Sequence, residues 1–96
     1  MLVLITYDVN TSTSAGAKRL RKVAHLCEKY GIRVQNSVFE VTADAAQMVT
    51  LKAGIEQLID RENDSVRFYK LGNTFENKIE TLGRTPVIQT GGPMIL

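Results

Sequence analysis

The chain opens with an apolar run that ends at a carboxylate. Residues 1–7 are mostly apolar and rich in β-branched side chains, and Asp8 closes the run. A short, continuous apolar run is typical of a strand that is buried on both faces, which predicts a central strand of a sheet. Asp8 then lies where the strand leaves the sheet, where a carboxylate can hold a metal ion or hydrogen-bond the following turn.

Helical and strand periodicities alternate along the next sixty residues. Residues 17–30 follow a helical period, with Gly31 as the predicted C-terminal cap; the apolar face carries Leu20, Val23, Ala24 and Cys27. Residues 33–41 are strand-like, with a break at 36–37. Asp44, three residues before Gln47, predicts a capping box that opens a second helix, and residues 66–71 form another strand pattern.

This order of elements predicts an α+β sandwich of the ferredoxin-like βαββαβ type, with both helices on one face of a small sheet. We assign it to residues 1–82, with a further strand at 78–82. Residues 83–96 contain Gly91-Gly92-Pro93 and end in an apolar tail. Because apolar termini need a partner and a small sheet has an exposed edge, we expect an extra C-terminal strand that packs on the partner subunit of a homodimer. The alternative is that this segment packs on its own subunit.

Composition restricts the class of protein. The chain has 96 residues, 44% hydrophobic and 23% charged, which is typical of one globular domain. It contains no run long enough to span a membrane and no signal-peptide pattern, and we expect no membrane partner. A single cysteine, Cys27, fits the reducing cytoplasm, and one cysteine with one histidine excludes a structural zinc site within one subunit.

The net charge of +2 is unevenly distributed along the chain. Residues 1–39 carry a net charge of +4, whereas residues 40–96 carry −2. The first predicted helix has a basic outer face of Lys18, Lys22, His25 and Lys29, flanked by Arg19 and Arg21. Like charges four residues apart are mildly unfavourable, and phosphate binding would offset that cost. We therefore expect a surface that binds nucleic acid through its backbone; the alternative is an ordinary solvated face.

Asp8 alone makes a weak metal site. Magnesium prefers octahedral oxygen ligands, usually one or two carboxylates with water and substrate phosphate. The loop after Asp8 is neutral from Asn10 to Ser14 and offers no second carboxylate. A two-fold dimer that brings two copies of Asp8 together would supply one.

Three segments together resemble a known family. They are Tyr7-Asp8-Val9 at the end of the first strand, Gln35-Asn36-Ser37-Val38-Phe39-Glu40, and Val66-Arg67-Phe68-Tyr69-Lys70-Leu71. With the basic first helix between them, they resemble CRISPR-associated protein 2 over essentially the whole chain.

The resemblance implies a ferredoxin-like homodimer whose C-terminal strand lies on the partner. It also implies a role in adaptive immunity through spacer acquisition, together with the integrase CRISPR-associated protein 1, and metal-dependent endonuclease activity on double-stranded DNA or single-stranded RNA. The metal would be Mg²⁺ or another divalent cation such as Mn²⁺. The family's metal-binding aspartate matches Asp8, its second-strand arginine matches Arg33, and the phenylalanine of Ser-Val-Phe matches Phe39 as an auxiliary residue. We add Tyr7, the neighbour of Asp8, as a second auxiliary candidate. Some relatives carry further acids after the aspartate, and this chain does not.

Three functions of different classes follow from these observations. In the first, paired Asp8 carboxylates hold magnesium for phosphodiester hydrolysis, while Arg33 or helix cations stabilise the phosphate in the transition state. In the second, a non-catalytic dimer holds DNA on Lys18, Arg19, Arg21, Lys22 and Arg33 and serves as an adaptor for the integrase. The third, a regulatory ligand-binding domain or a toxin-type ribonuclease relative, ranks last because a regulatory domain needs no basic helix.

Overall fold

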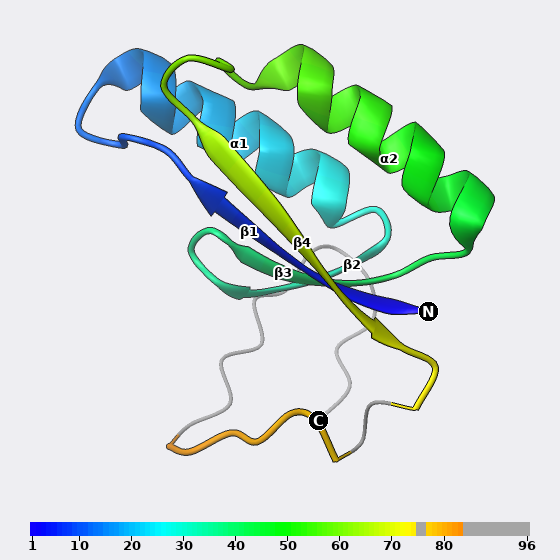
Figure 1. The fold of residues 1–96 in the computed structure, drawn as a ribbon. Helices are drawn as coiled ribbons and strands as arrows, with labels where there is room; N and C mark the ends of the chain where they lie inside the picture. The colour runs from blue at the N-terminus through cyan, green and yellow to red at the C-terminus, as the bar shows by residue number, and fades with distance from the viewer. Residues whose placement is uncertain (75–76, 84–96) are drawn as a thin grey trace.

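Four strands and two helices make up the described part of the chain. The computed structural model describes residues 1–74 and 77–83. The elements in chain order are β1 (Leu2–Asp8), α1 (Ser14–Cys27), β2 (Gly31–Gln35), β3 (Val38–Thr42), α2 (Ala45–Leu58) and β4 (Ser65–Gly72). All strand pairs are antiparallel in the order β2-β3-β1-β4, and both helices lie on one side of the sheet (Figure 1). The predicted ferredoxin-like βαββαβ fold is confirmed.

β1 is central, as its apolar run predicts. Ile5 lies between Phe39 of β3 and Phe68 of β4. Alternate β1 side chains, up to Tyr7 at 1% exposure, enter the core beneath the helices. The opposite face is less covered, because Leu4 and Thr6 are only half-buried. The strand is therefore central without being buried on both faces, since the helices cover one face alone.

Both helices begin at specific caps. The Thr13 side chain accepts a hydrogen bond from the Gly16 backbone N–H (3.0 Å) at the start of α1. A Cβ at residue 16 would lie 1.8 Å from the Asn10 carbonyl oxygen, so only glycine lets the β1–α1 loop pack this closely. The predicted capping box of α2 is confirmed: Gln47 N–H donates to Asp44 Oδ1 (2.7 Å), and Asp44 N–H donates to Gln47 Oε1 (2.9 Å).

Two predicted features differ from the structure. Helix α1 ends at Cys27, three residues before the predicted end of the helix at residue 30, and Glu28 is its C-cap. Gly31 instead begins β2, where a Cβ at residue 31 would lie 1.9 Å from the Glu40 carbonyl oxygen across the hairpin. The strand predicted at 78–82 is wrong: these residues form a turn and irregular chain, and the apolar Leu82 is 96% exposed with no face to cover. The predicted strand that docks on a partner falls on residues beyond 83, outside the described residues. No helix in the described ranges has the length and hydrophobicity to span a bilayer.

Candidate nucleic-acid interface

Asp8 is an exposed carboxylate at the end of the central strand. It lies opposite Ser65 of β4, and strand alternation directs it to the face of the sheet away from the helices. Arg67, opposite Thr6, lies on the same face and is also exposed. The guanidinium carbon of Arg67 lies 5.4 Å from the centre of the Tyr69 ring, which holds the arginine over the sheet.

The loop after Asp8 hydrogen-bonds to itself. The Asn10 side-chain oxygen accepts hydrogen bonds from the Ser12 N–H (3.0 Å) and hydroxyl (2.6 Å), so this oxygen is already occupied. Residues 1–74 and 77–83 contain no group of three or more His, Cys, Asp or Glu side chains placed to hold a metal ion. One chain therefore supplies a single carboxylate ligand and does not form a closed metal site. Such sparse ligation is typical of Mg²⁺, which keeps several of its waters when it is bound beside phosphate.

On the other side of β1, the neighbouring residue Tyr7 joins a buried polar network. The Tyr7 hydroxyl donates to Asp64 Oδ2 (2.5 Å), and Arg19 donates to both carboxylate oxygens (2.8 and 3.1 Å). The Asp60 backbone N–H supplies a fourth hydrogen bond (3.0 Å). The Asp64 side chain is 0% exposed and that of Arg19 is 23% exposed. The network ties the end of β1, the first turns of α1 and the α2–β4 turn together.

The network shifts the ionisation of its members. Burial would raise the pKa of Asp64, but hydrogen bonds from Arg19, Tyr7 and the Asp60 N–H outweigh it, so the pKa of Asp64 lies below its usual range. Burial and the hydrogen bond to Asp64 raise the pKa of Tyr7 to about 12. At neutral pH, therefore, Asp64 is ionised and Tyr7 remains a proton donor.

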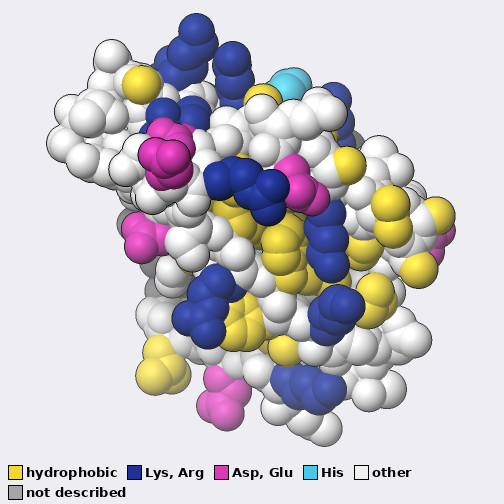
Figure 2. Space-filling view, turned by 45° about the horizontal axis from the view of Figure 1, so that its top comes forward, with side chains coloured by type: hydrophobic (Ala, Val, Ile, Leu, Met, Phe, Trp, Pro, Cys, Tyr) yellow, Lys and Arg dark blue, Asp and Glu magenta, His cyan; other side chains and the backbone are white. Residues whose placement is uncertain are grey.

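The outer face of α1 is basic and exposed, as predicted. A groove of about 460 Å³ between α1 and the end of α2 has an apolar base of Leu26 and Leu58. Its cationic lining is Lys18, Arg21, Lys22 and Lys29, and His25 lies among them. Figure 2 shows Lys and Arg side chains along the upper edge of the molecule, on either side of the single histidine. No carboxylate lines the groove in the described part of the chain. The surface therefore suits an anionic partner.

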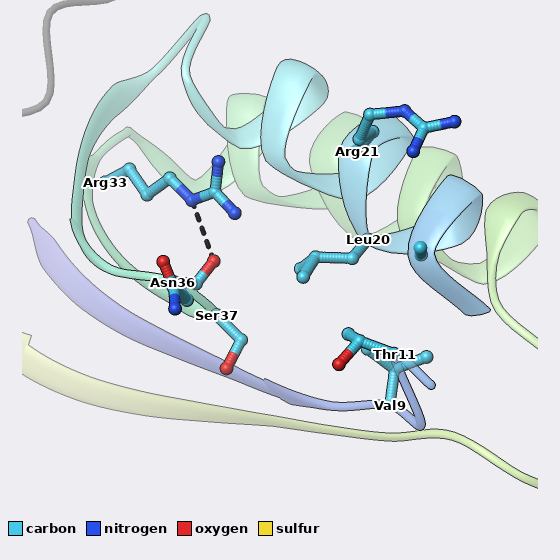
Figure 3. A pocket seen from close by; sticks show the side chains of 8 residues that line it. Val9, Thr11, Leu20, Arg21, Arg33, Asn36 and Ser37 are labelled. Carbon is cyan, nitrogen blue, oxygen red and sulfur yellow. Dashed lines mark hydrogen bonds between the residues drawn. The ribbon is translucent and has the colours of Figure 1, made fainter. Parts of the chain in front are cut away.

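A second cleft, of about 430 Å³, lies where the β1–α1 loop, α1 and the β2–β3 turn meet (Figure 3). Arg33 extends across it, with Nε donating to the Asn36 carbonyl oxygen (2.7 Å) and its guanidinium carbon 5.9 Å from the centre of the Phe39 ring. Figure 3 shows the guanidinium of Arg33 across the cleft from Leu20 on α1. Further lining residues are Val9, Thr11, Ala17, Arg21 and Ser37.

The structure changes three of the predicted site assignments. Phe39 is 0% exposed, so it offers no surface on which a base can stack, and its auxiliary role is to pack the core beneath Arg33. Arg33 pairs with Phe39 on the helix side of the sheet, the side opposite Asp8, and is not placed to act on the same phosphate within one chain. Arg19 is engaged by Asp64 and is a weaker candidate for DNA contact than its exposed neighbours Lys18 and Lys22.

Sequence reasoning missed Asp64 and Arg67. A signal for the Asp64 network was present, because Arg19 lies one helical turn before the buried Val23 and Tyr7 falls on the core face of β1. A buried tyrosine hydroxyl and an arginine beside the core both need an acceptor. Nothing in the sequence places that acceptor at Asp64, 45 residues from Arg19.

Comparison with known proteins shows the family to which the chain belongs. The family model described as CRISPR associated protein Cas2 matches residues 1–79. The chain is 55% identical over 95 residues to the CRISPR-associated endonuclease Cas2 of Halalkalibacterium halodurans, covering 99% of each chain. It is 48% identical to the CRISPR-associated endoribonuclease Cas2 3 of Rhodospirillum rubrum, covering 99% of this chain and 100% of the relative.

A solved structure supports the same assignment. The crystal structure of Streptococcus pyogenes Cas2 at pH 6.5 matches with a TM-score of 0.82 and 57% identity, over 86% of this chain and 100% of that one. Sequence and fold agree over nearly the whole chain, and the chain belongs to the Cas2 family.

Proposed function

We propose that this protein acts in CRISPR adaptive immunity, where it takes part in spacer acquisition and cleaves phosphodiester bonds of double-stranded DNA or single-stranded RNA with the help of Mg²⁺ or Mn²⁺. The observation that carries the proposal is the exposed Asp8 carboxylate at the rigid end of the central strand, with Arg67 on the same face and a carboxylate-free basic helix on the same domain. The names of the relatives, endonuclease and endoribonuclease, support the hydrolytic part.

The proposed active form is a homodimer. The face of the sheet that carries Asp8 also carries Ile32 (41% exposed) and Tyr69 (40% exposed), together with half-buried Leu4. Exposed apolar residues on an uncovered sheet face favour association with a second copy. A two-fold axis near the β1 ends would supply the second carboxylate, and residues 83–96 would lie on the partner. Sedimentation velocity should give a dimer, and Ile32→Lys should shift it towards monomer.

Asp8, Arg67 and the cations of α1 would have different roles in the hydrolysis. Asp8 and its symmetry mate would hold the divalent cation, which supplies charge neutralisation at the phosphate and a more acidic water. Arg67 would donate to a non-bridging phosphate oxygen as negative charge develops there. Lys18, Arg21 and Lys22 would bind flanking phosphates and carry no sequence preference.

The test is Asp8→Asn with Asp44→Asn as its matched control. Asp44 lies beyond the opposite end of β1, and asparagine caps a helix about as well as aspartate, so the control makes the same chemical change without harm to the fold. With Mg²⁺, Asp8→Asn should lose cleavage and keep duplex binding, whereas Asp44→Asn should keep both. Cleavage by Asp8→Asn at the wild-type rate would refute the catalytic role.

A second candidate function is a non-catalytic adaptor that holds DNA for the integrase CRISPR-associated protein 1. The basic face of α1 favours it, because that face serves binding whether or not Asp8 cuts, and one chain offers only one carboxylate. A spacer-integration assay with the integrase separates the two functions. Integration that survives Asp8→Asn would assign the adaptor role, whereas integration lost with cleavage would assign the nuclease role.

A further inference from the structure

The cleft that Arg33 crosses differs from the basic face of α1 in both shape and chemistry. The outer face of α1 presents mostly lysines, which are flexible point charges. The cleft is concave, with apolar Val9 and Leu20 on one side and the Arg33 guanidinium on the other, and Ala17 also lines it. Its volume of about 430 Å³ lies within the range of small-molecule sites.

Arg33 is held in place before any ligand arrives. Its Nε donates to the Asn36 carbonyl oxygen and its plane lies over buried Phe39, so the side chain has two anchors on its own hairpin. The hairpin is fixed to β1 in turn, because the Tyr7 N–H donates to the Ser37 carbonyl oxygen (2.9 Å). The terminal nitrogens of Arg33 make no hydrogen bond or ion pair to any residue the structure describes. A preorganised guanidinium with free terminal N–H groups suits bidentate binding of a phosphate.

The opposite wall is equally well fixed. Gly16 allows the loop after β1 to lie against the first turn of α1, and this contact places Val9 and Thr11 at the cleft. No acidic side chain lines the cleft among the described residues, so nothing there repels an anion. A fitting ligand therefore carries a phosphate at one end and an apolar ring at the other, which is the chemistry of a nucleotide.

We infer that this cleft binds one unpaired nucleotide of a nucleic-acid strand, with its phosphate on Arg33 and its base against Leu20 and Ala17. A paired duplex turns its phosphates outward and its bases inward, so it can touch Arg33 but cannot fill the apolar wall. A strand end or an extruded base can do both, and burial of a base face against aliphatic side chains adds affinity without hydrogen bonds that would read its identity. The inference rests on the proposed nucleic-acid function and adds the form of strand that the protein prefers.

The experiment measures fluorescence anisotropy in EDTA, so that no cleavage occurs. The probes are a blunt 20-bp duplex, the same duplex with a 5′-phosphorylated one-nucleotide overhang, and the same overhang without its base. The wild-type protein should bind the overhang about 5-fold or more tightly than the blunt end, the gain expected from burying about 40 Å² of apolar surface, and should lose that gain when the base is absent.

Two variants test the walls of the cleft separately. Ala17→Leu fills the cleft and keeps every cation, and Arg33→Gln removes the guanidinium; both should abolish the overhang preference. Ala15→Leu, the same change on an exposed position of α1 outside the cleft, and Arg61→Gln, an exposed arginine elsewhere, should retain it. Ala17→Leu should change blunt-duplex affinity less than about 2-fold, because the phosphate contacts that dominate duplex binding remain. Circular dichroism melts establish that each variant is folded.

The outcomes separate this inference from the proposed function. Blunt-duplex binding without an overhang preference overturns the cleft assignment and leaves nucleic-acid binding intact. Binding of no probe overturns both. Adenosine 5′-monophosphate is the probe for a free nucleotide: if it occupies the cleft as tightly as the overhang does, as judged by competition, the occupant is a free nucleotide and the strand assignment is overturned. An overhang preference that Ala17→Leu retains also overturns it.

Discussion

Asp64 provides a quantitative test of how the fold fixes the end of β1. Its carboxylate is 0% exposed and accepts hydrogen bonds from the Tyr7 hydroxyl, two nitrogens of Arg19 and the Asp60 N–H. Asp64→Ala removes the acceptor and leaves a buried hydroxyl and a guanidinium without partners. Loss of one member of a buried pair costs about 3–5 kcal/mol of unfolding free energy.

The partial exposure of Arg19 lowers the expected cost of Asp64→Ala in unfolding free energy. Its side chain is 23% exposed, so water solvates part of the freed guanidinium. We therefore expect Asp64→Ala to lower the unfolding free energy by about 2–4 kcal/mol. For a domain of this size, each kcal/mol shifts the melting temperature by about 4–8 °C, which gives a fall of roughly 8–30 °C.

The assay is urea unfolding at fixed protein concentration, since dimerisation would make stability depend on concentration. The matched control is Glu56→Ala, which removes the exposed partner of Arg61 in a 3.6 Å ion pair. Its cost should stay below about 1 kcal/mol, as is usual for a surface pair. If Asp64→Ala costs no more than Glu56→Ala, the network does not stabilise the fold and this reasoning is wrong.

The pH dependence gives an independent check on Asp64. Because its pKa is lowered in the folded state, Asp64 contributes stability that is fully present above the usual aspartate pKa of about 4 and is lost as the pH falls through the folded value. The stability difference between wild type and Asp64→Asn should therefore be constant from pH 5 to 8 and shrink below pH 4. A difference that grows on acidification would contradict the lowered pKa.

Three further predictions concern other parts of the molecule. Burial and Asp64 raise the pKa of Tyr7 to about 12, so between pH 10 and 12 the unfolding free energy should fall by about 2 kcal/mol, and Tyr7→Phe should remove this loss. Alkaline urea titrations in a Cys27→Ala background exclude the buried thiol, whose pKa is also raised to about 12. Gly16→Ala should cost about 1–3 kcal/mol in urea unfolding, because the new methyl group meets the Asn10 carbonyl; a neutral result would contradict the tight loop. Replacing Lys18 and Lys22 with glutamine should reduce the slope of log binding constant against log salt by about 2 for duplex DNA, and an unchanged slope would exclude this face.

Local sequence patterns were sufficient to predict most of the fold. Apolar periodicity placed both helices and all four strands, and the Asp44 and Gln47 capping box was correct in detail, because these signals act within a few residues. Gly31 was misassigned because its necessity arises across the hairpin, from Glu40, and not from the helix before it. The strand predicted at 78–82 was wrong because a local sequence pattern cannot show whether a neighbouring strand or surface is there to pair with it.

The candidate site was less predictable, because it depends on which face of the sheet each residue occupies. Asp8 and Arg33 were grouped as one site, yet register puts Arg33 beside Phe39 on the helix side and Asp8 on the other. Register is set by pairings between distant segments, which a single sequence does not show. The same pairings bring Arg67 to the Asp8 face, where no motif had marked it.

Lys18 and Arg19 have different surroundings, so the effects of their variants have different interpretations. Arg19 and Lys18 are adjacent in sequence and equal in charge, but Arg19 is bound to buried Asp64 whereas Lys18 is exposed. An Arg19 variant would leave Asp64 as a buried carboxylate without its counter-ion, one residue from Ser65, the cross-strand neighbour of Asp8. Lost cleavage in such a variant therefore reports a displaced strand end as readily as a missing phosphate contact. Lys18→Gln changes the surface charge alone, so a loss of DNA binding at unchanged stability in this variant identifies the nucleic-acid surface. A loss of both DNA binding and stability in Arg19→Gln instead identifies Arg19 as a support of the strand end that carries Asp8.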